Sequence, residues 1–209
     1  MFKDCDTIIE MNFIKFDAKQ CSYITYMFNN CQSLISIDLS GFITSNLLQD
    51  LSSLFNNCNS LKSVDLSTFD ISQVFSFGHM FNNCKSLTSI YFPNIKTEKA
   101  KYLDFIFNGY EKLTSLNLSN FITSKVINFA FMFNGCKSLK LLDFSNLEIK
   151  NVQNSDNAKN IFLGGKNLEF LNINNINSDI ELKNEFFNGF PTNKLIICIN
   201  DEKIQLIKD

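Results

Sequence analysis

The sequence contains no Trp and no Arg, and its 19 basic residues are therefore all Lys. These lysines are scattered among 21 acidic residues, which leaves a formal net charge of −2. Proteins that bind nucleic acid usually carry a clustered stripe of Arg and Lys that contacts phosphates. We therefore expect no nucleic-acid partner.

Histidine is almost absent, since His79 is the only one in 209 residues. A single His excludes a two-His metal site, and no Cys-x-x-Cys spacing suggests zinc. No Gly-rich phosphate loop or nucleophile elbow occurs either. We predict that the protein is not an enzyme, binds no metal and needs no cofactor.

Long apolar runs are also missing. No stretch of 18 apolar residues could cross a bilayer, so we expect no membrane insertion within this chain. No signal peptide is visible, because Lys3, Asp4 and Asp6 are followed by no apolar run. With only two prolines and no linker-like segment, residues 1–209 are predicted to form one domain, with repeats over 1–190 and a cap over 191–209.

Phenylalanine, by contrast, is abundant and regularly placed. A short phrase around one Phe recurs at intervals of 25 to 29 residues. The eight repeat positions are Phe2, Phe28, Phe55, Phe81, Phe107, Phe133, Phe162 and Phe187. A fixed period in the twenties is typical of a solenoid, in which each unit buries its apolar side against its neighbours. The phrase already begins at Phe2, so the chain is expected to start partway through a unit.

A second phrase follows each repeat Phe and has the pattern L-x-x-V-x-L-x-x-F, as in Leu61, Val64, Leu66 and Phe69. Alternation at its second and third apolar positions is the two-residue period of a strand with one buried face. This is the strand signature of a leucine-rich repeat.

In the five units from Phe28 to Phe133, the segment before the repeat Phe has apolar residues seven, four and one positions earlier, as in Leu48, Leu51 and Leu54. That spacing predicts a short helix with one apolar stripe, with Ser45, Ser72 and Ser124 near its start as N-caps. Two residues after each repeat Phe from Phe28 onward, only Asn or Gly occurs: Asn30, Asn57, Asn83, Gly109, Gly135, Gly164 and Gly189. These residue types predict a left-handed stop to the helix.

The predicted fold is therefore α/β: a leucine-rich-repeat solenoid of about seven to eight coils, each with a short parallel strand and a short helix. Parallel strands would line one concave face. The polar residues 151–158 fall in the longest interval and are predicted to form a surface bulge. Alternating Leu195, Ile197 and Ile199 predict a final strand within a C-terminal β cap.

The runs Met80 to Ser89 and Asp65 to Asp70 resemble the BspA-type leucine-rich repeat of bacterial and protist surface proteins. The resemblance spans about residues 1–190. It implies a solenoid used for adhesion or ligand capture outside the cell.

Seven cysteines are present, and five of them share one repeat column: Cys5, Cys31, Cys58, Cys84 and Cys136. We interpret this column as a ladder of small buried thiols between coils. Disulfides between adjacent coils are the alternative, although parallel stacking points the Cβ atoms the same way.

Outward-facing strand residues are the candidate ligand-binding site. They are Ser36, Asp38, Ser63, Asp65, Ser89, Tyr91, Ser115, Asn117, Leu141, Asp143, Phe170 and Asn172. Asp and Ser could simply solvate this face and support the turn after each strand, or Asp38 and Asp65 could share a Ca²⁺ ion. The third possibility is a protein or glycan ligand, anchored where Tyr91, Leu141 and Phe170 interrupt the polar pattern.

The sequence thus predicts a non-enzymatic binding or adhesion module at the cell surface or outside the cell. Its partner would be a protein or a glycan. The alternative is a cytoplasmic scaffold for protein–protein interaction, which unpaired thiols and the lack of a visible leader would suit.

Overall fold

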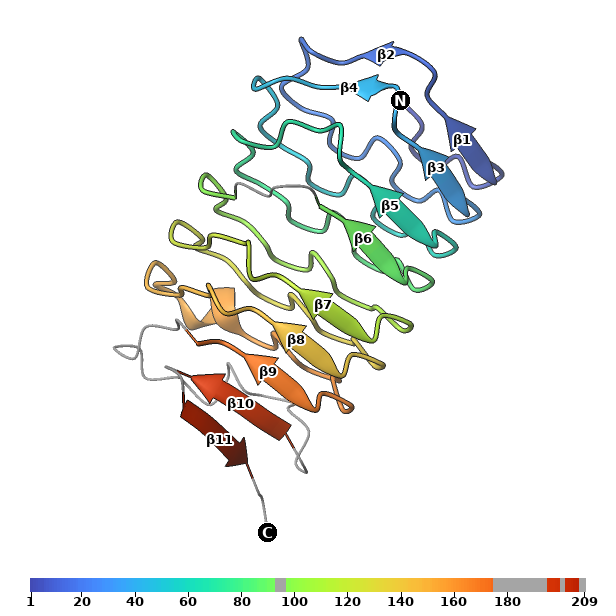
Figure 1. Ribbon diagram of the computed structural model, residues 1–209. Coiled ribbons are helices and arrows are strands. Elements are labelled where there is room, and N and C mark those ends of the chain that lie inside the picture. The colour runs from blue at the N-terminus through green and yellow to red at the C-terminus, as the bar shows by residue number, and fades with distance from the viewer. Residues whose placement is uncertain (93–96, 175–194, 200–201, 207–209) are drawn as a thin grey trace.

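A computed structural model describes residues 1–92, 97–174, 195–199 and 202–206. These residues wind into a parallel-strand solenoid of about six turns, so the expected count of seven to eight coils is not confirmed. Strands β1 and β11 lie at opposite ends of the solenoid (Figure 1). Each turn is called a coil below and is named by its repeat Phe, such as the Phe81 coil.

Short parallel strands stack along one side of the solenoid, which we call the strand face (Figure 1). They are β1 (Glu10–Asn12), β3 (Ser36–Asp38), β5 (Ser63–Asp65), β6 (Ser89–Tyr91), β7 (Ser115–Asn117), β8 (Leu141–Asp143), β9 (Phe170–Asn172) and β10 (Leu195–Ile199). Hydrogen bonds join β1 with β3, β5 with β6, and β7 through β10 in order. The predicted parallel strands are therefore present, but they do not form one uninterrupted sheet.

Both ends of the solenoid carry further strands. The short β2 (Phe16–Asp17) pairs in parallel with β4 (Phe42–Ile43). At the other end, β10 pairs in parallel with β9, and β11 (Glu202–Leu206) pairs antiparallel with β10. The predicted final strand is thus confirmed, and an antiparallel strand follows it at that end.

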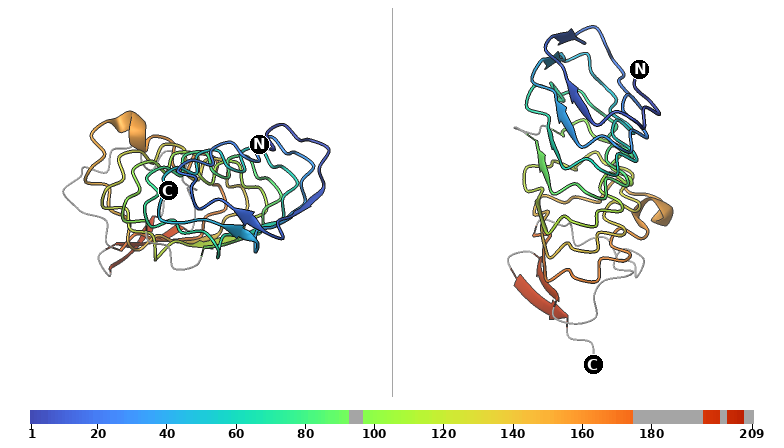
Figure 2. Two further views of the ribbon diagram at one scale, coloured as in Figure 1. Left: turned by 90° about the horizontal axis from the view of Figure 1, so that it is seen from above. Right: turned by 90° about the vertical axis from the view of Figure 1, so that its right-hand side faces the viewer.

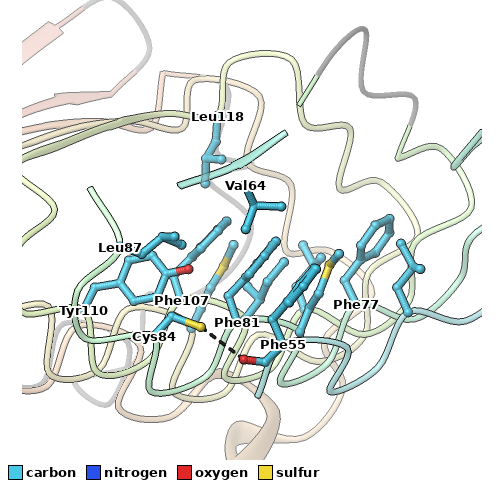
Figure 3. Packing of buried hydrophobic residues seen from close by; sticks show 14 of the residues in the cluster. Phe55, Val64, Phe77, Phe81, Cys84, Leu87, Phe107, Tyr110 and Leu118 are labelled. Atoms are coloured by element: carbon cyan, nitrogen blue, oxygen red, sulfur yellow. Dashed lines mark hydrogen bonds between the residues drawn. The ribbon is translucent and has the colours of Figure 1, made fainter. Parts of the chain in front are cut away.

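The repeat phenylalanines form the centre of the core. Phe28, Phe55, Phe81, Phe107, Phe133 and Phe162 are all buried. Most rings of successive coils stack nearly parallel; those of Phe28 and Phe55, for example, have centroids 5.2 Å apart and planes at 11°. Figure 3 shows part of this stack with the surrounding buried side chains. The first repeat residue, Phe2, is half-buried, and Phe187 lies outside the described residues.

The predicted helix is wrong. From Phe28 to Phe133, the segment before the repeat Phe, called the turn segment below, is a succession of turns in which alternate backbone N–H groups donate to the next coil. Ser53 and Phe55 donate to the carbonyls of Gly78 and Met80, while Leu54 donates to Leu51 within its own coil. A helix would direct all of these N–H groups along its own axis. The apolar stripe is nevertheless buried, because residues three apart also share one side of a chain of turns.

Left-handed residues explain why no helix forms. The Asn and Gly column is confirmed, with φ between 59° and 84° from Asn30 to Gly164. A second left-handed column, which the sequence did not reveal, stands two residues before the repeat Phe: Tyr26, Ser53, His79, Phe105, Phe131 and Asn160. Two left-handed residues in five cannot belong to a right-handed helix. Ser45, Ser72 and Ser124 therefore cap no helix.

The longest repeat interval contains the short 3₁₀ helix η1 (Ser155–Ala158), none of whose residues is buried. It projects from the side of the solenoid opposite the strand face (Figure 2). The predicted surface bulge between coils is confirmed.

Candidate functional site

The predicted site residues occupy the first and third positions of β3, β5, β6, β7, β8 and β9. Most of their side chains are exposed, while Asp143, Phe170 and Asn172 are half-buried. Register pairs bring several of them side by side, as with Asp65 and Tyr91, and with Asn117 and Asp143. The strand face therefore presents all twelve residues on one side of the solenoid, spread over six strands.

The Asp and Asn residues at the third strand position close a turn after each strand. Asp38, Asp65, Asn117, Asp143 and Asn172 each accept a hydrogen bond from the backbone N–H two residues on, at 2.8 to 3.2 Å. The bond from Ser40 lowers the pKa of Asp38. Turn support, one of the roles considered for these side chains, is thus what their contacts show. No cluster of three or more His, Cys, Asp or Glu suited to a metal occurs among the described residues.

Strand β6 departs from this pattern. Tyr91 stands where β3, β5, β7, β8 and β9 carry Asp or Asn, and Pro93 stands where the same five strands are followed by Ser or Asn. A proline has no N–H to donate and a tyrosine has no carboxyl or amide oxygen to accept, so these two residue types cannot make the hydrogen bond found after the other five strands. The sequence already marked Tyr91 as an interruption of the polar pattern.

Between β6 and β7 the strand face opens into a slot. One backbone hydrogen bond recurs at the same repeat position between successive coils. The N–H of Lys62 donates to the carbonyl of Ile35, that of Thr88 to the carbonyl of Lys62, and that of Lys140 to the carbonyl of Thr114. The equivalent bond between the coils of β6 and β7, from the Thr114 N–H to the Thr88 carbonyl, is missing among the described residues. In the described chain, no hydrogen bond joins residues 84–92 to residues 110–121. Every Cα atom of β6 also lies more than 8 Å from every Cα atom of β7, whereas paired strands are about 4.8 Å apart.

The slot is closed at both of its ends. On one side Asn83 donates its N–H to the carbonyl of Asn108 at 2.8 Å. On the other side the buried Thr97 hydroxyl accepts from the Ile122 N–H at 2.7 Å and donates to the Ile122 carbonyl at 2.9 Å. Within the described residues, the two coils are therefore separated where their strands would otherwise pair and joined on both sides of that opening.

The resulting cleft has a volume of about 330 Å³. Its lining is Thr88, Ser89, Ile90, Tyr91, Phe92, Leu113, Ser115, Leu116, Asn117, Asn120 and Phe121. Apolar side chains such as Ile90 and Leu116 are half-buried, whereas Tyr91 is 58% exposed. The cleft thus combines an apolar floor with a rim of hydroxyl, amide and phenol groups.

The ring stack in the core is interrupted at the same place. Phe55 stacks on Phe81 and Phe107 stacks on Phe133, but Phe81 and Phe107 do not stack on each other. Instead Phe92 packs edge-on against both, with centroid distances of 6.1 Å and 6.5 Å. Figure 3 shows Phe81 and Phe107 with the buried side chains around them. The discontinuity therefore reaches from the surface into the core.

A separate apolar row crosses β8, β9 and β10. Leu141 pairs in register with Phe170, and Phe170 with Ile196. Leu141 is 50% exposed and Ile196 is 39% exposed. Leu141 and Phe170 are thus brought together, whereas Tyr91 lies apart from them beyond the slot and β7. Ile196 was missed because only its inward neighbours, Leu195 and Ile197, gave a sequence signal.

The sequence matches the family described as Mycoplasma protein of unknown function, DUF285, over residues 1–108 and 49–171. The chain belongs to this family. No curated protein matches the sequence. None of the helices in the described ranges is long and apolar enough to cross a bilayer. Membership in DUF285 assigns no ligand, so the geometry of the strand face is the guide to function.

The cysteine column forms the predicted ladder inside this solenoid. Cys31, Cys58, Cys84 and Cys136 are buried, and each thiol donates to the carbonyl of the repeat Phe in the preceding coil at 3.1 Å. Figure 3 shows the bond from Cys84 to Phe55. Burial raises the pKa of Cys58 and Cys136 to about 12. Cys5 and Cys198 are half-buried, Cys21 is exposed, and all seven cysteines are free thiols.

Tyr110 takes the place of a cysteine in this column, in the coil that forms one wall of the slot. Its side chain is fully buried, and its hydroxyl has no hydrogen-bond partner in the described part of the chain. Burial also raises its pKa well above the usual value. Tyr110, whose ring is larger than a cysteine side chain, stands between Cys84 and Cys136 in this column. It is a second position beside the slot at which the repeat pattern changes.

His79 lies on the turn segment and not on the strand face. Its ring stacks on Phe105 at 4.4 Å, and its Nε2 lies 3.5 Å from an Asp104 carboxylate oxygen. Partial burial lowers the pKa of His79 more than Asp104 raises it. His79 is therefore packed as one ring of an aromatic stack on the turn segment.

Proposed function

We propose that this protein is a non-enzymatic binding module that presents its strand face to a protein or glycan ligand. A repeat solenoid suggests a binding role because stacked units create an extended surface. The observation that carries the proposal is the slot between β6 and β7, with its apolar floor and with Tyr91 at its rim. Exposed aromatic side chains next to a cleft are frequent anchors in interfaces.

We further infer that the repeat is of the BspA-like leucine-rich type and that the protein acts in adhesion at the cell surface. The support is the 26-residue phrase with its leucine frame, now seen as buried residues of parallel strands. Localising a tagged protein in its own cell, by microscopy and by protease accessibility, tests this placement. Protection from external protease in intact cells would contradict it.

The alternative is an intracellular scaffold for protein–protein interaction. One observation favours it: all seven cysteines are free thiols, which suits a reducing compartment. The non-enzymatic role rests on the strand face, whose serines have no histidine near them among the described residues, because His79 lies on the turn segment.

The proposed function is tested with purified protein against a glycan array and a phage-displayed peptide library. Ligands recovered with the parent are measured again with Tyr91→Ala and Phe170→Ala. Tyr23→Ala is the matched control, because Tyr23 is 60% exposed and lies on the turn segment. We expect at least one strand-face variant to weaken binding by about tenfold or more while the control leaves it unchanged. Equal binding by all three variants would remove the strand face as the site.

A further inference from the structure

We propose that the slot binds a short extended peptide segment of a partner protein, inserted as an additional parallel strand between β6 and β7. This inference rests on the proposed binding function and names its ligand class. Such strand addition draws affinity from backbone hydrogen bonds and specificity from alternate side chains.

The two walls of the slot have backbone groups that lack partners elsewhere in the described chain. On the β6 side these are the carbonyl of Thr88 and the N–H of Phe92. On the β7 side they are the N–H of Thr114 and the carbonyl of Asn117. In joined coils the equivalent groups are paired, as when Thr88 donates to Lys62 and Leu66 donates to Tyr91. The walls are thus two facing strand edges.

One inserted strand can form hydrogen bonds with both edges. The pairing seen between joined coils shows which residues of the inserted strand would donate and which would accept. Its first residue would donate to Thr88 and accept from Thr114. Its fourth would accept from Phe92, and its fifth would donate to Asn117. A segment of about five residues in parallel orientation is sufficient. Two neighbouring strand spacings amount to about 9.6 Å, which agrees with the separation of more than 8 Å between β6 and β7.

The side chains around the slot define the sequence of the segment. Its third residue would point inward over Ile90 and Leu116, which calls for an aliphatic side chain. Its second and fourth would point outward beside Ser89 and Tyr91, which are uncharged, so polar residues suit both positions. Because Asn83–Asn108 and Thr97–Ile122 close the ends, the segment must enter and leave from the outer side. A loop or terminal tail of a partner protein meets these requirements.

The probe is a capped synthetic peptide with the sequence of residues 113–119, Leu-Thr-Ser-Leu-Asn-Leu-Ser, which has this polar–aliphatic–polar pattern. Binding to the parent protein is measured by fluorescence polarisation beside a scrambled peptide of the same composition. We expect saturable binding of the probe only. No binding at about 1 mM peptide would overturn the proposal.

Two changes test whether the backbone of the peptide is what the slot recognises. In the peptide, N-methylation of the last leucine, the fifth inserted residue, removes the N–H that would donate to Asn117 and keeps the side chains. In the protein, Thr114→Pro removes an N–H that has no partner in the described structure. Each change is expected to weaken binding by about tenfold or more. Thermal unfolding verifies that the Thr114→Pro protein is folded, and the methylated peptide provides the test if it is not.

The outcomes separate this inference from the proposed function. Full binding of the methylated peptide would show that no strand pairing occurs. Full binding by folded Thr114→Pro would place the peptide elsewhere, such as on the open edge of β1, and would also overturn the proposal. If the probe fails while another ligand depends on Tyr91, strand insertion is refuted and the binding function stands.

Discussion

The ring of Phe92 packs edge-on against the ring of Phe107, with centroids 6.5 Å apart and planes at 82°. Phe92 belongs to the coil of β6, and Phe107 belongs to the coil of β7. An edge-on contact keeps the two coils in apolar contact at a point where their repeat rings do not stack. The slot can therefore open on the strand face while the core beneath it remains filled.

The stacked rings predict the stability effect of core truncation. Phe55→Ala or Phe81→Ala should lower the free energy of unfolding by about 3–5 kcal/mol, because either change leaves a cavity in the ring stack. Chemical denaturation measures the loss, with the exposed Tyr23→Ala as a control that should change little. A loss below about 1 kcal/mol would contradict the burial of the repeat phenylalanines.

The turns after the strands predict a difference between two substitutions at one position. Asp65→Ala removes the acceptor for the Ser67 N–H and should cost about 0.5–1.5 kcal/mol. Asp65→Asn should cost little, because Asn117 and Asn172 hold the same turn with an amide oxygen. Urea unfolding of the two variants provides the comparison. Equal losses for Ala and Asn would mean that charge, rather than the turn bond, is what matters at Asp65.

The thiol ladder predicts selective alkylation. In native protein at pH 8, iodoacetamide should modify Cys21, which is exposed, and leave Cys58, Cys84 and Cys136 unmodified. The reactive species is the thiolate, and burial raises the pKa of these three thiols far above pH 8. Mass spectrometry of tryptic peptides identifies the modified sites.

Unfolding without reductant completes that experiment. All seven cysteines should then react, since each is a free thiol in the structure. Fewer than seven modified cysteines would reveal disulfides and refute the ladder.

His79 predicts a pH dependence of stability. Its pKa in the folded protein is below the usual value, mainly because of burial, so the unfolded chain binds its proton more readily. The free energy of unfolding should therefore be lower below about pH 6.5 and should rise as the pH increases through that value. Asp104, whose pKa is raised by burial, affects stability with the opposite sign in a more acidic range.

The variant His79→Phe tests this dependence. Phe105 and Phe131 occupy equivalent left-handed positions in neighbouring coils, so a phenyl ring should be accepted there. The slope of unfolding free energy between pH 5.5 and 7.5, measured by urea titration, should become shallower. An unchanged slope would assign the pH dependence to other groups.

Much of the core could be predicted from the sequence, because burial imposes a period that side chains record. The repeat Phe column, the alternating leucine frame and the Asn and Gly column all appear where expected. The helix could not be distinguished from a chain of turns, since an apolar residue at every third position suits both. The deciding feature is whether an N–H such as that of Phe55 bonds within its coil or to the next one, and no side-chain pattern records this.

The candidate site was predictable only in part. From β3 to β9, Tyr91 and Pro93 alone break a column that holds Asp or Asn followed by Ser or Asn, so β6 is marked as different in the sequence alone. The sequence does not show that β6 pairs with β5 and not with β7, because this depends on how neighbouring coils pack. The positions of Tyr110 and Phe92 beside the slot could not be predicted, because the sequence does not show which rings they contact.

Amide hydrogen exchange at two threonines tests the central claim, that β6 and β7 are separated by an opening on the strand face. Thr88 and Thr114 occupy the same repeat position, but only the N–H of Thr88 donates to the coil before it. We predict slow exchange at Thr88 and Lys140, and fast exchange at Thr114, in NMR spectra of the free protein. Slow exchange at Thr114, as slow as at Thr88, would mean that β6 and β7 are paired and that no slot exists.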